Sequence, residues 1–282
     1  MRKDQLAFSW FLAGLALLSA AFALLVLLAP AVHAAQRAPL WTYRVVATRA
    51  HDTGAFTQGL VVQGGKLIES TGRYGHSALI VRDLATGVAV RRIALASDLF
   101  GEGVAVAGGR VFQLTWKSGL ALLYDLKLRP AGRFRYDGEG WGLAYDGKQL
   151  LMSDGSPHIA LRRPDTFEVT GGFDVKDGTA PVERLNELEV AHHLLYANVW
   201  ETDRIAAIDP GSGAVRGWLD LSALRQGMRK PDTWDEREHV LNGIAFDSAS
   251  GHFYVTGKCW PVLFEIDIDA PKDPLAGLPG AE

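Results

Sequence analysis

The chain has 282 residues, of which 48% are hydrophobic, so it is long enough to bury a core, and one closed all-β domain fits this length. Its formal net charge of −3 gives no basic face for nucleic acid, so we expect no nucleic-acid partner. The single cysteine, Cys259, excludes an intrachain disulfide. It lies in the apolar stretch KCWPVLF, which favours a buried, unreactive thiol over a nucleophile.

Residues 1–34 have the composition of an export signal. Arg2 and Lys3 precede an uncharged run, Leu6–Ala29, and Val32–Ala34 provides a small-residue cleavage site. The uncharged run is also long enough to cross a bilayer as an uncleaved anchor. We therefore expect an exported protein, periplasmic or secreted, that contacts a membrane only if residues 1–34 are retained.

A pattern of turn, short apolar strand, loop and second strand then occurs five times. Repetition at about 40 to 55 residues indicates a modular fold. Most of the loops carry hairpin residues, such as Gly64-Gly65 and Asp146-Gly147. The five copies are Phe56–Ser70, Phe100–Trp116, Glu139–Asp154, Leu185–Trp200 and Leu241–Gly257.

A third strand follows each copy, and a fourth follows the first four copies. The third strands are Ala78–Asp83, Leu120–Asp125, His158–Arg162, Arg204–Asp209 and Val262–Asp267. The fourth strands are Val88–Ile93, Arg133–Tyr136, Glu168–Val175 and Ala214–Leu219.

The fifth copy lacks a fourth strand, but a spare strand, Thr42–Ala47, precedes the first copy. Adding this strand to the last sheet would close a ring and remove an exposed edge. The sequence therefore predicts an all-β, five-bladed β-propeller over residues 35–270, with an N-terminal strand closing the last blade. Residues 271–282 are rich in proline and are expected to form a flexible tail.

One long insertion separates the fourth and fifth copies. Ser222–Met228 is expected to form a short helix, and Trp234–His239 a charged loop. Such an insertion can act as a lid or a partner contact, and it can equally be a surface excursion without a role.

Equivalent positions of the copies should face one another around the axis of the ring. These ring positions are occupied by one carboxylate, three amides and an indole: Gln58, Glu102, Trp141, Asn186 and Asn242. Glu102 lies between two glycines, and burial in an enclosed site would raise the pKa of its carboxyl group. Such a group can accept and return a proton near neutral pH. The alternative is an ordinary hydrogen-bonded glutamate.

Aromatic residues occur at related positions of several copies. Trp116 and Trp200 end the second strands of copies two and four, and Phe56 and Phe100 stand just before ring residues. Tryptophan usually lies in the core, but with Trp141 these positions favour the walls of a small pocket.

The remaining polar candidates have two interpretations each. The amides of Gln58, Asn186 and Asn242 can hold an amide or ammonium group, or they can satisfy the backbone of turns. Lys258 can stabilise a negative oxygen, or it can be an ordinary solvated lysine. The histidines show no metal-ligand spacing, so no metal and no cofactor is expected.

Nine short motifs in series carry a resemblance to a known family. They are FTQGL, ESTGRYG, FGEG, LTWK, EGWGLAYDG, LNELE, NVWETD, LNGIAFD and VTGKCWP. From Tyr43 to Asp267 the chain resembles glutaminyl-peptide cyclotransferases of the plant and bacterial type. The resemblance implies a five-bladed propeller enzyme that needs no metal and cyclises N-terminal glutamine to pyroglutamate with release of ammonia.

Carried over by motif, the resemblance makes Glu102 the acid/base residue. It also implies eight substrate-binding residues: Phe56, Gln58, Phe100, Trp116, Trp141, Asn186, Trp200 and Lys258. The expected partners are peptides or proteins with N-terminal glutamine, and we expect a monomer. Two alternatives are a metal-dependent, lactonase-like propeller hydrolase and a non-catalytic propeller that binds partners.

Overall fold

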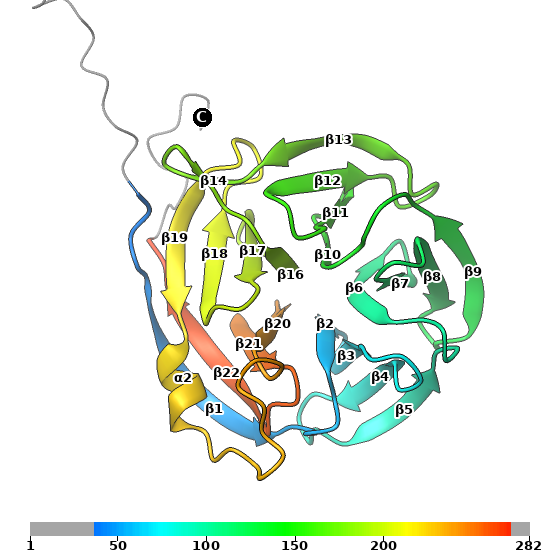
Figure 1. The fold of residues 1–282 in the computed structure, drawn as a ribbon, viewed down its shortest axis with the longest axis horizontal. Coiled ribbons are helices and arrows are strands. Elements are labelled where there is room, and N and C mark those ends of the chain that lie inside the picture. Colours follow the sequence, from blue (N-terminus) through cyan, green and yellow to red (C-terminus); the bar gives the residue numbers. More distant parts are fainter. Residues whose placement is uncertain (1–36, 272–282) are drawn as a thin grey trace, which may run out of the picture. The chain divides into compact units, whose positions relative to one another are not determined.

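The computed structural model describes residues 37–271, which form five four-stranded antiparallel sheets around a central axis (Figure 1). This arrangement confirms the predicted five-bladed β-propeller. The predicted leader, residues 1–34, and the predicted tail beyond Pro271 lie outside the described residues.

Each blade runs from an inner strand at the axis to an outer strand. Blade 1 contains β2 (Thr57–Gln63), β3 (Lys66–Thr71), β4 (Ala78–Asp83) and β5 (Ala89–Ala94). Blade 2 contains β6 (Gly101–Ala107), β7 (Arg110–Thr115), β8 (Leu120–Asp125) and β9 (Pro130–Arg135). Blade 3 contains β10 (Leu143–Tyr145), β11 (Leu150–Met152), β12 (His158–Arg162) and β13 (Val169–Asp174). Blade 4 contains β16 (Leu185–Ala191), β17 (Leu194–Val199), β18 (Arg204–Ile208) and β19 (Val215–Asp220).

The last blade contains both ends of the described chain. Its sheet has the order β1-β22-β21-β20, in which β1 (Thr42–Ala50) pairs antiparallel with β22 (Val262–Asp269). The inner strands of this blade are β20 (Leu241–Asp247) and β21 (His252–Gly257). The predicted closure by an N-terminal strand is therefore confirmed. With β1 included, each of the five blades has four strands.

Two local features differ from the sequence prediction. Strand β9 begins at Pro130 rather than at Arg133, which is possible because an outer edge strand tolerates proline. A small hairpin of β14 (Lys176–Asp177) and β15 (Ala180–Pro181) between blades 3 and 4 was not predicted.

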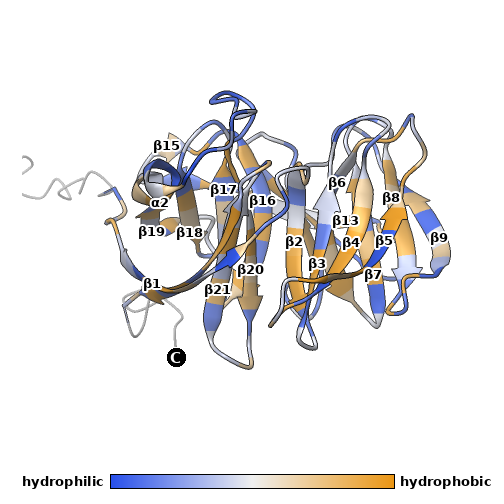
Figure 2. Cartoon of the chain, turned by 90° about the horizontal axis from the view of Figure 1, so that it is seen from below, coloured by the Kyte–Doolittle hydropathy of each residue, from blue (hydrophilic) through white to orange (hydrophobic). Residues whose placement is uncertain are grey.

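The core consists of five hydrophobic clusters, one at each interface between neighbouring blades. Figure 2 shows the apolar residues along the strands. In β17, Leu194 and Tyr196 belong to the cluster shared with blade 5, whereas Leu195 and Ala197 belong to the cluster shared with blade 3. Successive strand residues point to opposite faces, so a strand buried on both faces is apolar throughout.

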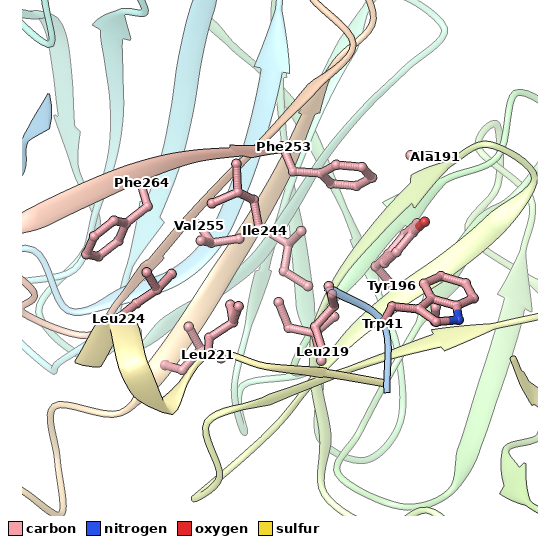
Figure 3. Packing of buried hydrophobic residues seen from close by; sticks show 14 of the residues in the cluster. Trp41, Ala191, Tyr196, Leu219, Leu221, Leu224, Ile244, Phe253, Val255 and Phe264 are labelled. Atoms are coloured by element: carbon pink, nitrogen blue, oxygen red, sulfur yellow. The ribbon is translucent and has the colours of Figure 1, made fainter. Parts of the chain in front are cut away.

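The insertion packs on the interface between blades 4 and 5. Its helix α2 (Ser222–Gly227) has the predicted position, and Leu224 lies close to Phe264 of β22 (Figure 3). Leu221 and Met228 are buried in the same cluster. No helix within residues 37–271 is long and apolar enough to cross a membrane.

The inner strands approach one another closely at the glycines that follow two ring residues. A Cβ atom on Gly59 would lie 2.5 Å from the nitrogen of Val104, and one on Gly103 would lie 2.5 Å from the nitrogen of Leu143. Only glycine leaves room for these backbone contacts, which explains the TQG and GEG patterns.

A buried glutamate joins three inner strands across the axis. The carboxyl group of Glu187 on β16 accepts hydrogen bonds from Leu60 N at 3.1 Å on β2 and from Ile244 N at 2.6 Å on β20. Burial raises the pKa of Glu187 well above its ordinary value. Sequence analysis assigned Glu187 no role although it lies in the quoted LNELE motif, because its two hydrogen-bond donors come from strands of other blades.

We expect Glu187→Ala to lower the free energy of unfolding by about 2–4 kcal/mol, because two buried N–H groups would lose their acceptor. Urea unfolding of the purified protein measures this loss. Glu183→Ala, which removes an exposed glutamate with no side-chain partner in residues 37–271, is the control. Equal unfolding midpoints for the two variants would contradict the role of Glu187.

Candidate active site

A cavity of about 260 Å³ lies at the axis, next to the start of the inner strands. It is lined by Glu102, by all eight predicted substrate-binding residues and by two further residues. The lining residues are Phe56, Gln58, Arg73, Phe100, Glu102, Trp116, Trp141, Asn186, Trp200, Glu238 and Lys258. Asn242, the remaining ring residue, does not line the cavity.

Glu102 is 4% exposed and sits in a β-bulge of β6, between Gly101 and Val104. Bulges interrupt the regular alternation and can redirect a side chain, here into the cavity. Its Oε1 atom accepts a hydrogen bond from Gln58 Nε2 at 2.8 Å, while its buried Oε2 atom has no partner among the described residues. One carboxyl oxygen is therefore left without a hydrogen-bond donor among the described residues, which buried polar atoms seldom are.

Burial raises the pKa of Glu102 well above its ordinary value. Lys258 and the hydrogen bond from Gln58 act in the opposite direction, and Glu139 adds to the increase. The predicted direction of the shift is confirmed. A carboxyl group in this state can accept a proton and return it near neutral pH.

A chain of amides orients Glu102. Asn242 Nδ2 donates to Gln58 Oε1 at 3.1 Å and to the carbonyl oxygen of Thr57 at 3.0 Å. Gln58 therefore turns its amide nitrogen toward Glu102. Both functional groups of Gln58 are engaged, so this residue positions the carboxyl group as well as lining the cavity.

Five aromatic rings form the walls. Phe100 contacts Phe56 and Trp116, with ring centroids 6.3 Å and 5.5 Å away, and Trp141 stands at 89° to Trp200 at 5.6 Å. Trp116 and Trp141 share one hydrogen-bond acceptor. Their indole nitrogens both donate to Glu139 Oε2, at 2.6 Å and 3.0 Å respectively. This shared acceptor holds the two indoles in fixed orientations.

Lys258 and Asn186 supply the remaining polar groups inside the cavity. Lys258 is 5% exposed, and burial lowers its pKa although the nearby charge of Glu102 opposes this. Asn186 is 3% exposed, and its Oδ1 atom has no hydrogen-bond partner in the described part of the chain. The cavity lining thus contains two buried acceptor oxygens without partners among the described residues and a cation, a set that suits a small ligand with N–H donors and a carbonyl oxygen.

A buried ionic network joins the segments that carry Phe56 and Lys258. His51 contacts Glu69 Oε1 at 3.0 Å through Nε2 and the carbonyl oxygen of Trp260 at 2.9 Å through Nδ1. Burial disfavours the charged imidazole, but Glu69 outweighs this effect, so the pKa of His51 is raised. Burial alone would raise the pKa of Glu69, yet His51, Arg82 and Thr57 together lower it to about 2.

Sequence analysis missed three residues of the site. Arg73 lies in the quoted ESTGRYG motif, Glu139 opens the EGWG motif and Glu238 belongs to the insertion. No repeat pattern relates Arg73 and Glu238, which reach the cavity from loops, whereas Glu139 acts through the indoles of Trp116 and Trp141. Cys259 is 3% exposed, as expected, and burial raises the pKa of its thiol. Among residues 37–271, no three His, Cys, Asp or Glu side chains gather as metal ligands do.

The fold and the site define an enzyme built on a β-propeller, with a carboxyl group at its axis. A sequence profile described as glutamine cyclotransferase matches residues 17–268. A glutaminyl-peptide cyclotransferase of Arabidopsis thaliana is 42% identical over 229 residues, which cover 79% of this chain and 70% of the plant protein. The crystal structure of Myxococcus xanthus glutaminyl cyclase superposes with a TM-score of 0.73 at 38% identity, covering 82% of this chain and 98% of that chain. The chain therefore belongs to the glutamine cyclotransferase family.

We expect Glu102→Gln to raise the melting temperature at about pH 8 by about 2–4 °C, which corresponds to about 1 kcal/mol in a domain of this size. The folded-state pKa of Glu102 exceeds the ordinary value of 4.5, so wild-type stability falls as the pH rises from 4.5 through the folded pKa. The neutral amide does not suffer this loss. Below the ordinary pKa the two proteins should melt together.

Thermal melts across this pH range test the expectation. Glu183→Gln, which changes an exposed glutamate, is the control. A melting difference between Glu102→Gln and wild type that does not vary with pH would argue against a raised pKa.

Proposed function

We propose that this protein converts the N-terminal glutamine of peptides to pyroglutamate with release of ammonia, and that Glu102 moves the proton. The observation that carries the proposal is Glu102, which lines an aromatic cavity beside Lys258 and whose buried Oε2 atom has no partner within residues 37–271. The names of the plant and bacterial relatives support the same reaction.

The proton transfers follow from the reaction. The α-amine must be neutral before its nitrogen forms a bond to the γ-carbonyl carbon of the same residue. As the nitrogen of the neutral amine bonds to this carbon, the carboxylate of Glu102 accepts one of its two protons, and a tetrahedral intermediate with a negative oxygen forms. The protonated carboxyl group then gives this proton to the amide nitrogen as its bond to carbon breaks, and ammonia leaves. One carboxyl group can serve both steps without a covalent intermediate.

The other cavity residues would position and stabilise the reacting groups. Lys258 is the cation that can stabilise the oxygen of the side-chain carboxamide of glutamine as this oxygen becomes negatively charged. The open Oδ1 atom of Asn186 can accept an N–H from the substrate. Ring closure depends on holding the glutamine side chain in a folded conformation, and rigid indole walls such as Trp141 and Trp200 favour that conformation.

Two alternatives are separated from this proposal by simple assays. A metal-dependent propeller hydrolase predicts that a chelator abolishes activity, whereas we propose a metal-independent reaction. A non-catalytic propeller that binds partners predicts no ammonia release from peptides that begin with glutamine. Ammonia release that persists in excess EDTA would exclude both alternatives.

We also propose that the protein is exported as a monomer and that residues 1–34 direct its export. The basic start, uncharged run and small-residue site of this segment support the proposal. Expression of the full chain in a bacterium with subsequent cell fractionation and N-terminal sequencing tests it. We expect a periplasmic protein that begins at residue 35; a full-length protein in the membrane fraction would favour a retained anchor. Size-exclusion chromatography with light scattering tests the monomer.

We expect Glu102→Gln to reduce kcat for a glutamine-initiated dipeptide by at least about 10²–10⁴-fold, the usual contribution of a positioned acid/base group. An enzyme-coupled ammonia assay measures the loss. Glu183→Gln should retain wild-type activity, and circular dichroism should show that both variants are folded. Near-normal turnover by Glu102→Gln would remove Glu102 from the mechanism.

A further inference from the structure

The mouth of the cavity carries two exposed charges of opposite sign. Arg73 and Glu238 line the cavity together with the buried groups Glu102, Asn186 and Lys258, but both are solvent-exposed. They come from different blades: Arg73 follows β3, and Glu238 precedes β20. A ligand whose reactive end lies at Glu102 must pass these two side chains.

Arg73 is held by its backbone and by a cation–π contact, which leave its N–H groups without partners among the described residues. Its backbone has a φ of 84°, and its carbonyl oxygen accepts hydrogen bonds from His76 N at 3.0 Å and Ser77 Oγ at 2.8 Å. The guanidinium group lies 4.4 Å from the ring centroid of Phe56. It makes no ion pair or side-chain hydrogen bond within residues 37–271. Its five N–H donors are therefore open.

Of the three acids in Trp234–His239, two are engaged and Glu238 is not. Asp235 accepts hydrogen bonds from the backbone nitrogens of Arg237 at 2.8 Å and Glu238 at 3.2 Å. Glu236 pairs with Lys230 at 2.5 Å and Arg225 at 3.1 Å. The carboxylate of Glu238 has no partner in the described part of the chain.

The loop of Glu238 is anchored next to the cavity. The carbonyl oxygen of His239 accepts a hydrogen bond from Trp260 Nε1 at 3.0 Å, and Trp260 follows Lys258 by two residues. The insertion therefore contributes a side chain to the cavity, although sequence analysis left its role open.

Other charges next to the cavity are engaged with one another. Glu139 lies 3.5 Å from Lys117, and Arg184 pairs with Glu201 beside Trp200. Arg73 and Glu238 do not pair with each other. Two opposite charges at the mouth, neither of them paired within the described residues, suit a ligand group that has both an acceptor and a donor.

We propose that Arg73 and Glu238 form a subsite for the peptide group that joins the glutamine to the second residue of the substrate. The guanidinium group donates to the carbonyl oxygen, and the carboxylate accepts the N–H. A peptide group carries both a carbonyl oxygen and an N–H, one for each of the two side chains. This subsite rests on the proposed function and names its substrate class: peptides rather than free glutamine.

Free glutamine would interact with the two charges differently. Its α-carboxylate can still bind Arg73, but it offers no N–H to Glu238 and is repelled by that carboxylate. Removing Glu238 should therefore weaken the binding of a peptide and strengthen the binding of free glutamine. Removing Arg73 should weaken both.

Binding is measured in the Glu102→Gln background, where no turnover is expected, by the fluorescence of the cavity tryptophans. The ligands are glutaminyl-alanine amide and free L-glutamine. Arg73→Ala and Glu238→Ala should each raise the Kd of the dipeptide amide about tenfold, the loss expected for one charged hydrogen bond. Arg73→Lys should recover part of the loss because it keeps the charge. Arg135→Ala and Glu183→Ala, which remove exposed charges elsewhere, should leave both Kd values unchanged.

The subsite is refuted if Arg73→Ala and Glu238→Ala bind the dipeptide amide as tightly as the two controls do. It is also refuted if Glu238→Ala shifts the Kd values of both ligands in the same direction. Ammonia release by the wild-type protein tests the proposed function separately. A protein that binds the dipeptide through Arg73 and Glu238 but releases no ammonia would overturn the reaction and leave the subsite standing.

Discussion

The pairing of β1 with β22 is the constraint on which the site depends, because it closes a ring whose centre is the cavity. The walls come from every blade: Phe56 from blade 1, Glu102 from blade 2, Trp141 from blade 3, Asn186 from blade 4 and Lys258 from blade 5. Each blade buries both faces against its neighbours, so its position is set by two interfaces. An open ring would expose two of these faces and separate Lys258 from Phe56.

Three buried glutamates show how the fold assigns different chemistry to one residue type. Glu69 is surrounded by His51, Arg82 and Thr57, which lower its pKa to about 2 and make it a permanent anion. Glu187 lies among backbone amides, and its pKa is raised by burial. The pKa of Glu102 is also raised by burial, but of the three only Glu102 lines the cavity and has an oxygen without a partner in the described residues. The first two glutamates hold strands and loops together, and the third can exchange a proton with a ligand.

The site contains polar atoms that burial makes costly. A buried acceptor without a partner costs about 1–3 kcal/mol, and Glu102 Oε2 and Asn186 Oδ1 are two such atoms in one cavity. The buried ammonium group of Lys258 adds to this cost, because burial lowers its pKa. Local deviations of this kind are expected where a fold is adapted to bind a ligand. The apolar interfaces between blades, which surround the cavity, offset the cost.

The sequence by itself determined the propeller, its closure and the nine predicted site residues that the cavity brings together, because repeat spacing, hairpin residues and strand patterns are local signals. It also located the short helix of the insertion. Only the tertiary structure revealed Arg73 and Glu238 at the cavity, Glu139 between the indoles of Trp116 and Trp141, and Glu187 across the axis. These side chains act through loops and strands of different blades, and the meeting of such segments depends on how the sheets pack. No spacing along the chain encodes that contact, so it becomes visible only when the ring has closed.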